Sequence, residues 1–169
     1  IKNDVVSVIN FIKYYNQTNK NLKTKEQIQK EVLAALNEMR KLDNVNDYIF
    51  IYNFDGTSIH NPIAKNNIGK NLFEYKDEEG KSVVKDLIDV SKRYLGGEVE
   101  YIWFKPDITT NAKKISYAKS YDEWEWTIGK GVYLNEIDKL VNDKVDEFNQ
   151  RISNSTLQII SLTIMLVLY

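Results

Sequence analysis

The chain has 169 residues, a length that suits one domain, and its 43% hydrophobic and 28% charged residues are typical of a folded globular protein. Its formal net charge is −1, and lysines are interleaved with acidic residues, so we expect no nucleic-acid partner, which would require a clustered basic surface. The absence of cysteine excludes disulfide bonds and cysteine-ligated metals.

Helical spacing of apolar residues predicts two helices at the start of the chain. The first carries an apolar stripe made of Val5, Val8, Ile9 and Ile12. Thr24 and Gln27 then form a capping-box pattern that begins a second helix, which we expect to end near Leu42. We assign residues 1–43 to an N-terminal helical segment. The length of the first helix and its stripe, taken as exposed, lead us to expect a homodimer that forms through this helix.

The period changes to that of a strand after residue 47. Tyr48, Phe50 and Tyr52 alternate with two isoleucines, so both faces of this strand are apolar and we expect both to be covered. Asp55-Gly56 predicts a hairpin turn, after which residues 57–60 return. The polar stretch 61–80 is long for a loop in a compact domain, and such loops are usually functional or contain short helices.

The second half of the chain predicts a helix and three more strands. An amphipathic helix starts near Val83 and includes Leu95 on its apolar side, with Gly96-Gly97 ending it. Residues 98–106 form the next strand, 107–113 a loop, and 114–133 two strands joined at Asp122-Glu123. Together with the first helices this pattern predicts an α+β domain, an antiparallel sheet with helices on at least one face. The core of this domain spans residues 44–133.

A last helix begins at Leu134. Its apolar residues step by three or four to Ile152, and no charged residue follows Ile152. We assign residues 134–156 to a connecting helix and 157–169 to the start of a truncated transmembrane helix, because thirteen helical residues span only roughly 20 Å of the roughly 30 Å of a bilayer core. The alternative is a buried C-terminal core helix.

No combination of residues predicts catalysis, a metal site or a cofactor. Gly129-Lys130-Gly131 lacks the spacing of a phosphate-binding loop, and we expect it to serve backbone packing. His60 is the only histidine, so neither a catalytic triad nor a histidine-based metal site has enough residues. His60 is either structural or part of a ligand site. We expect no enzyme activity.

Aromatic residues are concentrated on the predicted strands, where tyrosine hydroxyls and indole groups could line a small polar pocket. The only arginines, Arg40, Arg93 and Arg151, all fall on predicted helices. A carboxylate bound at the sheet would therefore need another donor, unless Arg93 reaches over from its helix. The remaining donors are Lys114, Lys119, His60 and the tyrosine hydroxyls.

Several short motifs together resemble one family, the single Cache domains, which are extracytoplasmic sensor modules of bacterial chemoreceptors and sensor histidine kinases. The resemblance covers roughly residues 25–138. Its motifs are "DYIFIYNFDGTSIHNP", "IGKNLFEYKDEEGKSVVKDLIDVSK", "GGEVEYIWFKP" and "KKISYAKSYDEWEWTIGKGVYLNEID". The chain departs from the family pattern at His60-Asn61-Pro62, where the family has histidine directly before proline.

The resemblance implies a PAS-like antiparallel sheet preceded by a long N-terminal helix, and a pocket for a small organic acid between the sheet and the long loop. It implies the ligand-binding residues His60, Tyr101, Trp103, Lys114 and Tyr117. Lys114 and Tyr117 lie three apart on one strand and should point to opposite faces, so we expect one of them to be structural. Trp126 and Gly131 also match, and we expect them to be packing residues.

The function that these features predict is ligand sensing. The domain would lie on the periplasmic side of the inner membrane of a bacterium, between flanking transmembrane helices, and pass its signal to a methyl-accepting, kinase or cyclase output. The alternative is a membrane-anchored domain that recognises a protein partner without a small-molecule ligand.

Overall fold

The computed structural model describes residues 1–40 and 44–167, with side chains up to residue 159. The chain divides into two compact units, Ile1–Leu134 and Asn135–Tyr169. The first unit holds a five-stranded antiparallel sheet and three α-helices, and the second unit continues a single helix. The predicted α+β class with an antiparallel sheet is confirmed.

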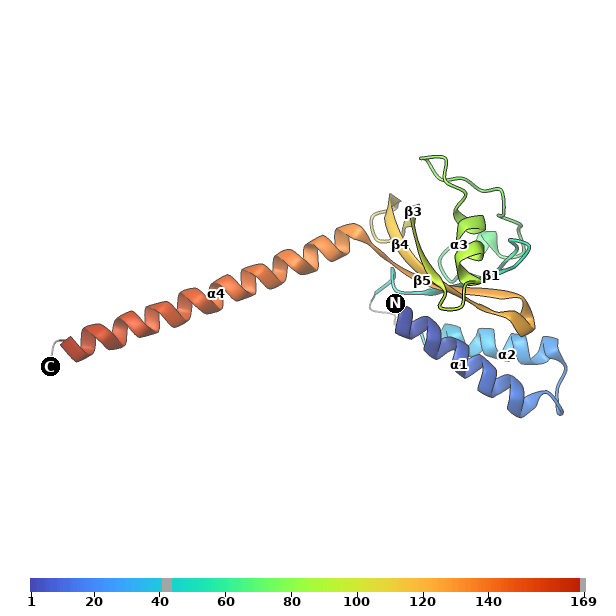
Figure 1. Ribbon diagram of the computed structural model, residues 1–169, viewed down its shortest axis with the longest axis horizontal. Coiled ribbons are helices and arrows are strands. Elements are labelled where there is room, and N and C mark those ends of the chain that lie inside the picture. The colour runs from blue at the N-terminus through green and yellow to red at the C-terminus, as the bar shows by residue number, and fades with distance from the viewer. Residues whose placement is uncertain (41–43, 168–169) are drawn as a thin grey trace. The chain divides into compact units, whose positions relative to one another are not determined.

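Two helices cover one face of the sheet (Figure 1). They are α1 (Lys2–Asn19) and α2 (Lys25–Glu38), and α2 begins with the predicted Thr24–Gln27 capping box. The apolar stripe of α1 is buried in a cluster that also contains Ile51, Trp126 and Ile128 of the sheet. Our prediction that this stripe is exposed and forms a dimer contact is therefore wrong, because helical periodicity alone does not distinguish a core face from an interface.

The second helix ends earlier than predicted. Its last residue is Glu38, and Met39 and Arg40 already lie in the following turn. The predicted end at Leu42 lies outside the described residues. Arg40 is therefore placed in a loop rather than on a helix, which changes what its side chain can reach.

The sheet has the strand order β2-β1-β5-β4-β3, and every neighbouring pair is antiparallel. The strands are β1 (Ile49–Asn53), β2 (Ser58–His60), β3 (Gly97–Lys105), β4 (Thr110–Tyr121) and β5 (Trp126–Tyr133). Hairpins join β1 to β2, β3 to β4 and β4 to β5. Because β5 pairs with both β1 and β4, it brings the first strand next to the long hairpin.

The other face of the sheet is covered by α3 (Val83–Ser91) and the loop before it (Figure 1). This loop contains one short 3-10 helix, η1 (Lys65–Asn67). The helix α3 ends at Ser91, so Leu95 is not on its apolar side as predicted but exposed in the turn that leads to Gly96.

The carboxylate of Asp77 fastens the long loop to the edge strand β3. Its Oδ2 accepts a hydrogen bond from the backbone N–H of Ile102 at 2.9 Å, and its Oδ1 accepts from the N–H groups of Glu79 and Lys81. Burial alone would raise the pKa of Asp77, but these three backbone donors hold it below its usual value. The loop is thus held over the sheet by charge-assisted hydrogen bonds.

The hairpin between β4 and β5 turns where the sequence predicts, through the 3-10 helix η2 (Asp122–Trp124). Glu125 closes the turn with a left-handed backbone, φ +55°. Trp126 is buried and packs edge-on against Trp124 with ring centroids 4.8 Å apart. Its predicted packing role is confirmed.

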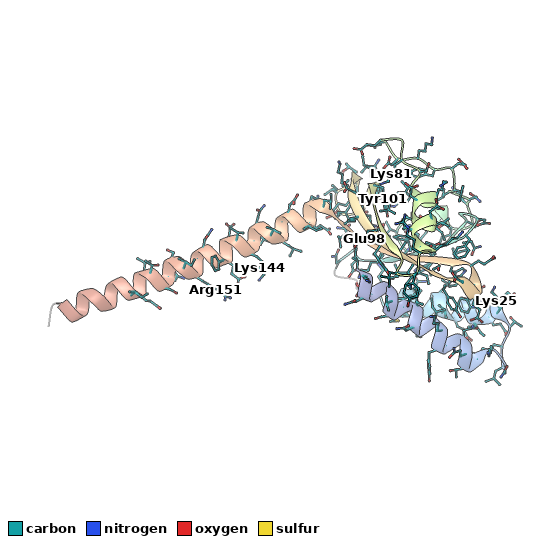
Figure 2. The ribbon with its side chains drawn as sticks, viewed as in Figure 1. Lys25, Lys81, Glu98, Tyr101, Lys144 and Arg151 are labelled. Atoms are coloured by element: carbon teal, nitrogen blue, oxygen red, sulfur yellow. The ribbon has the colours of Figure 1, made fainter. Side chains whose placement is uncertain are left out.

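The last helix, α4, spans Leu134–Val167. Figure 2 shows Lys144 and Arg151 projecting from it. No helix in the described part of the chain combines the length and the apolar character that crossing a bilayer requires. The predicted division between a connecting helix at 134–156 and a membrane segment at 157–169 stays a prediction, and residues 168 and 169 lie outside the described residues.

Candidate functional site

The register of three strands brings Lys114 between two tyrosines. On β3, Tyr101 lies directly opposite Lys114, and on β5, Tyr133 lies opposite it on the other side. Partners directly opposite in antiparallel strands project to the same face of a sheet. This is the face covered by α3, where Tyr101 is buried (Figure 2).

The ammonium group of Lys114 is enclosed by aromatic residues. The side chain is 1% exposed, and its Nζ donates a hydrogen bond to the hydroxyl of Tyr48 at 2.8 Å. The Nζ atom also lies 4.1 Å from the ring centroid of Tyr48, 4.9 Å from that of Tyr133 and 5.9 Å from that of Phe50. Aromatic faces attract a cation, but they do not neutralise it.

Among the described residues, no carboxylate forms an ion pair with Lys114. Two other lysines of the sheet are paired with carboxylates, which is the usual way in which a protein neutralises a buried ammonium group. Lys105 is 2% exposed and is paired with Asp107 at 2.5 Å, and Lys130 is paired with Asp4 at 2.8 Å and with Asp47. A buried charge without a counter-charge is costly, which makes Lys114 the candidate position for a bound anion.

Glycines on β5 make the space that this arrangement needs. A Cβ at Gly131 would lie 2.0 Å from the Oγ of Ser116 and 2.6 Å from the Cε of Lys114. A Cβ at Gly129 would lie 2.3 Å from the ring of Phe50. The Gly-Lys-Gly motif therefore serves close packing, as predicted. The groups that pack against these glycines are the side chains of Phe50, Ser116 and Lys114.

A hydroxyl pair lies beside Lys114 on the same face. The hydroxyls of Tyr101 and Ser116 are hydrogen-bonded to each other at 2.8 Å. Burial raises the pKa of Tyr101 well above its ordinary value, although the hydrogen bond with Ser116 opposes this. Tyr101 therefore stays protonated and can donate a hydrogen bond to a ligand.

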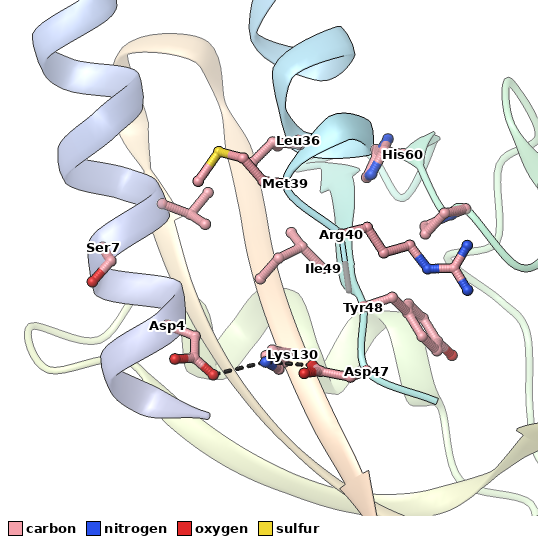
Figure 3. Close-up of a pocket in the computed structure, with 12 residues that line it drawn as sticks. Asp4, Ser7, Leu36, Met39, Arg40, Asp47, Tyr48, Ile49, His60 and Lys130 are labelled. Carbon is pink, nitrogen blue, oxygen red and sulfur yellow. Dashed lines mark ion pairs between the residues drawn. The ribbon is translucent and has the colours of Figure 1, made fainter. Parts of the chain in front are cut away.

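Tyr48 also lines a cavity of about 260 Å³ near the end of α2 and the start of β1 (Figure 3). His60, Arg40 and Pro62 line the same cavity. His60 is 6% exposed, and burial lowers its pKa to about 4, so the imidazole is neutral at neutral pH and can hydrogen-bond a ligand without adding charge. Lys114 itself does not line this cavity; Tyr48 lines the cavity and also accepts the hydrogen bond from Lys114.

The structure separates the five predicted ligand residues. Tyr101 and Lys114 share one face, and His60 lines the cavity beside Tyr48. Tyr117 lies on the opposite face, in the cluster with α1, where its hydroxyl donates to the backbone oxygen of Leu95 at 2.5 Å. As the alternation of the strand predicts, Lys114 and Tyr117 therefore cannot serve the same pocket.

Trp103 lies next to Tyr101 and lines a separate hollow. Its ring packs edge-on against Tyr101 at 5.8 Å and against Tyr75 of the long loop at 5.3 Å. It lines a second hollow of about 490 Å³, together with Leu72 and Tyr75. Of the other predicted donors, Lys119 donates to the backbone oxygen of Tyr94, away from this face.

Sequence reasoning missed Tyr48, Tyr133 and Arg40 as site residues. Tyr48 and Lys114 are separated by 66 positions, and only the strand order brings them together. Gly131 was a usable signal for this site in the sequence. A glycine within a strand often marks a close approach by another group, and here the side chain of Lys114 passes over Gly131.

Comparison with known proteins identifies the family to which the chain belongs. The sequence model described as Cache domain matches residues 1–158. A sensor histidine kinase, MctS, from Rhizobium johnstonii is 34% identical over 113 residues, which is 66% of this chain and 24% of the kinase. The chain therefore aligns with about a quarter of the length of that relative.

Two solved structures are similar in fold. The first is a methyl-accepting chemotaxis protein from Vibrio parahaemolyticus, with 28% identity and a TM-score of 0.62, covering 75% of this chain and 86% of that one. The second is a Cache chemosensory domain described for carboxylic acid recognition, with 26% identity and a TM-score of 0.67, covering 78% of this chain and 87% of that one. The predicted PAS-like Cache fold is confirmed, and the chain belongs to the Cache domain family.

Proposed function

We propose that this domain is the extracytoplasmic ligand-binding sensor of a bacterial transmembrane receptor, and that its ligand is a small carboxylate held by Lys114. The observation that carries the proposal is the enclosed ammonium of Lys114, which has no acidic partner among the described residues. A carboxylate would supply the missing negative charge, and Tyr101 and Tyr48 would supply hydroxyl groups beside it. The carboxylic acid recognition described for a similar Cache domain supports the same ligand class.

The strand β5 offers a direct connection from the ligand to α4. It carries Gly131 and Tyr133 beside Lys114, and α4 begins at the next residue, Leu134. A shift of β5 on ligand binding would therefore reach the start of α4 without an intervening loop. A coupling free energy of about 1–3 kcal/mol between two sites is typical of allosteric proteins.

A panel of small carboxylates tests the proposal by thermal shift. Acetate, pyruvate, butyrate and succinate are compared with uncharged amides of the same size. A carboxylate that binds should stabilise the domain by about 2.7 kcal/mol at 100 times its dissociation constant, whereas the amides should not. The proposal fails if no carboxylate raises the melting temperature more than its amide.

Attachment to the inner membrane, with this domain on the periplasmic side, is part of the proposal. Residues 157–169 would begin a membrane-spanning helix, and the domain would have no catalytic role. The alternative function, recognition of a protein partner alone, is less well supported because the cavity of about 260 Å³ lined by Tyr48 and His60 leaves room for a small molecule.

We also propose that the domain forms a homodimer. The proposed dimer contact is on α4, not on α1 as the sequence led us to expect. One face of α4 carries a row of apolar side chains that are 39–62% exposed, at steps of three and four residues. They are Ile137, Val141, Val145, Phe148 and Ile152. A second copy of the same helix would cover this row in a coiled-coil-like contact.

Engineered cysteines test the α4 contact, since the chain has none of its own. Under mild oxidation, Val145→Cys should form a disulfide-linked dimer in good yield, because the two copies of this position meet. Asp143→Cys, which lies on the other side of the helix, should form much less. Equal cross-linking of both variants, or of neither, would show that this row is not the dimer contact.

A further inference from the structure

The cavity of about 260 Å³ in Figure 3 lies against the α1 and α2 side of the sheet. Its apolar lining comes from residues that belong to the cluster on that side or pack against it, Val8, Leu36 and Ile49. His60 is paired with Ile51 of the same cluster, and such partners project to the same face. The cavity shares Tyr48 with the Lys114 site, but neither Lys114 nor Tyr101 lines it.

Arg40 enters this cavity with donors that are not fully used. Its Nε is buried and has no hydrogen-bond partner, and its Nη2 donates only a long hydrogen bond of 3.4 Å to the backbone oxygen of Val45. No carboxylate in the described part of the chain lies within ion-pairing distance of the guanidinium. Because a guanidinium in a protein normally directs its donors at acceptors, those of Arg40 are available to an anion in the cavity.

The other charged groups of the cavity limit the charge of that anion. Asp4 and Asp47 both pair with Lys130, as the dashed lines in Figure 3 mark. The two carboxylates are therefore balanced by the ammonium of Lys130 and the guanidinium of Arg40. A ligand with one acidic group adds a single negative charge to this balanced lining, whereas a dianion would add two next to the aspartates, so the lining favours a monoanion.

The remaining lining suits a flat, apolar ligand body. Figure 3 shows the side chain of Arg40 extending between the rings of His60 and Tyr48. Burial lowers the pKa of His60 to about 4, so its ring is uncharged at neutral pH. A volume of about 260 Å³ is just below the range of about 300–1,000 Å³ for drug-sized ligands, which indicates a compact occupant. Aromatic rings pack favourably on other rings and on aliphatic side chains.

We propose that this cavity is a second ligand site, distinct from the Lys114 site, and that it binds a small aromatic monocarboxylate whose carboxylate pairs with Arg40. The planar fork of the guanidinium suits a carboxylate, and the apolar lining takes the aromatic ring. The proposal does not depend on a ligand at Lys114. An occupant would touch α1 through Val8 and β5 through Lys130, and β5 is the strand that continues into α4.

Benzoate and benzamide test this proposal, because they have the same shape and differ in charge. Isothermal titration at neutral pH should show that the wild-type domain binds benzoate at least about tenfold more tightly than benzamide. Arg40→Gln should weaken benzoate about tenfold or more and leave benzamide unchanged. Arg93→Gln is the matched control, since it removes the same charge from an exposed position after α3, and it should keep the wild-type affinity for benzoate.

Lys114→Met separates this site from the Lys114 site. Benzoate should bind this variant as tightly as the wild type, because Lys114 does not line the cavity. Four results would each overturn the second site: no binding of benzoate to the wild type, equal affinity for benzamide, an unchanged affinity in Arg40→Gln, or loss of benzoate binding in Lys114→Met. None of them decides whether Lys114 binds a small carboxylate, which the thermal-shift panel measures.

Discussion

Lys114→Met should abolish carboxylate binding while leaving the unliganded domain at least as stable as the wild type. Methionine keeps much of the length and apolar character of the lysine side chain but removes the ammonium group. Losing one partner of a buried charge pair costs about 2–5 kcal/mol of binding free energy. In the free domain the same change removes a buried charge that pairs with no carboxylate of the described residues, and such replacements are often neutral or stabilising. Titration calorimetry and thermal unfolding of the same samples measure the two effects.

Lys119→Met is the control for this experiment. Lys119 lies on the same strand as Lys114 but donates to the backbone oxygen of Tyr94 on the opposite side of the sheet. The variant has the same change of charge and should keep wild-type affinity. If Lys114→Met bound carboxylates as tightly as the wild type, Lys114 would not be the anchor. If it were strongly destabilised without ligand, the ammonium group would have a structural role instead.

The sequence predicted the strands of the site because their signals are local. The alternation of β4 already placed Lys114 and Tyr117 on opposite faces, and the structure adds which of them faces α3. Gly129 and Gly131 were correctly interpreted as packing positions. The contact between Tyr48 and Lys114 could not be predicted in this way, because it depends on β5 lying between β1 and β4, which no local pattern encodes.

Two errors have a common physical cause. The apolar stripe of α1 and the end of α2 were both inferred from helical period, which reports that a helix has an apolar face but not what covers it. In the structure the sheet covers α1, and the row of apolar residues left exposed is on α4. The early end of α2 at Glu38 frees Arg40 from the helix and lets it reach the cavity.

Acidification should destabilise the free domain through His60. Burial lowers the pKa of His60 from 6.5 to about 4 in the folded state, so the folded state resists a proton that the unfolded chain accepts. Stability is therefore complete above pH 6.5 and decreases as the pH falls toward 4. Between pH 7.5 and pH 5 the loss should be about 2 kcal/mol. Chemical unfolding at a series of pH values measures it.

The chain is well suited to this measurement because His60 is its only histidine, and ordinary carboxylates titrate mostly below this range. His60→Gln should give a nearly flat stability between pH 7.5 and pH 5, and an unchanged slope in this variant would assign the effect to other groups. A carboxylate bound in the cavity beside His60 would favour the imidazolium and raise its pKa. If the carboxylate that binds Lys114 extends into this cavity, the saturated domain should lose less stability on acidification than the free domain, which would connect the titration of His60 to occupancy of the site.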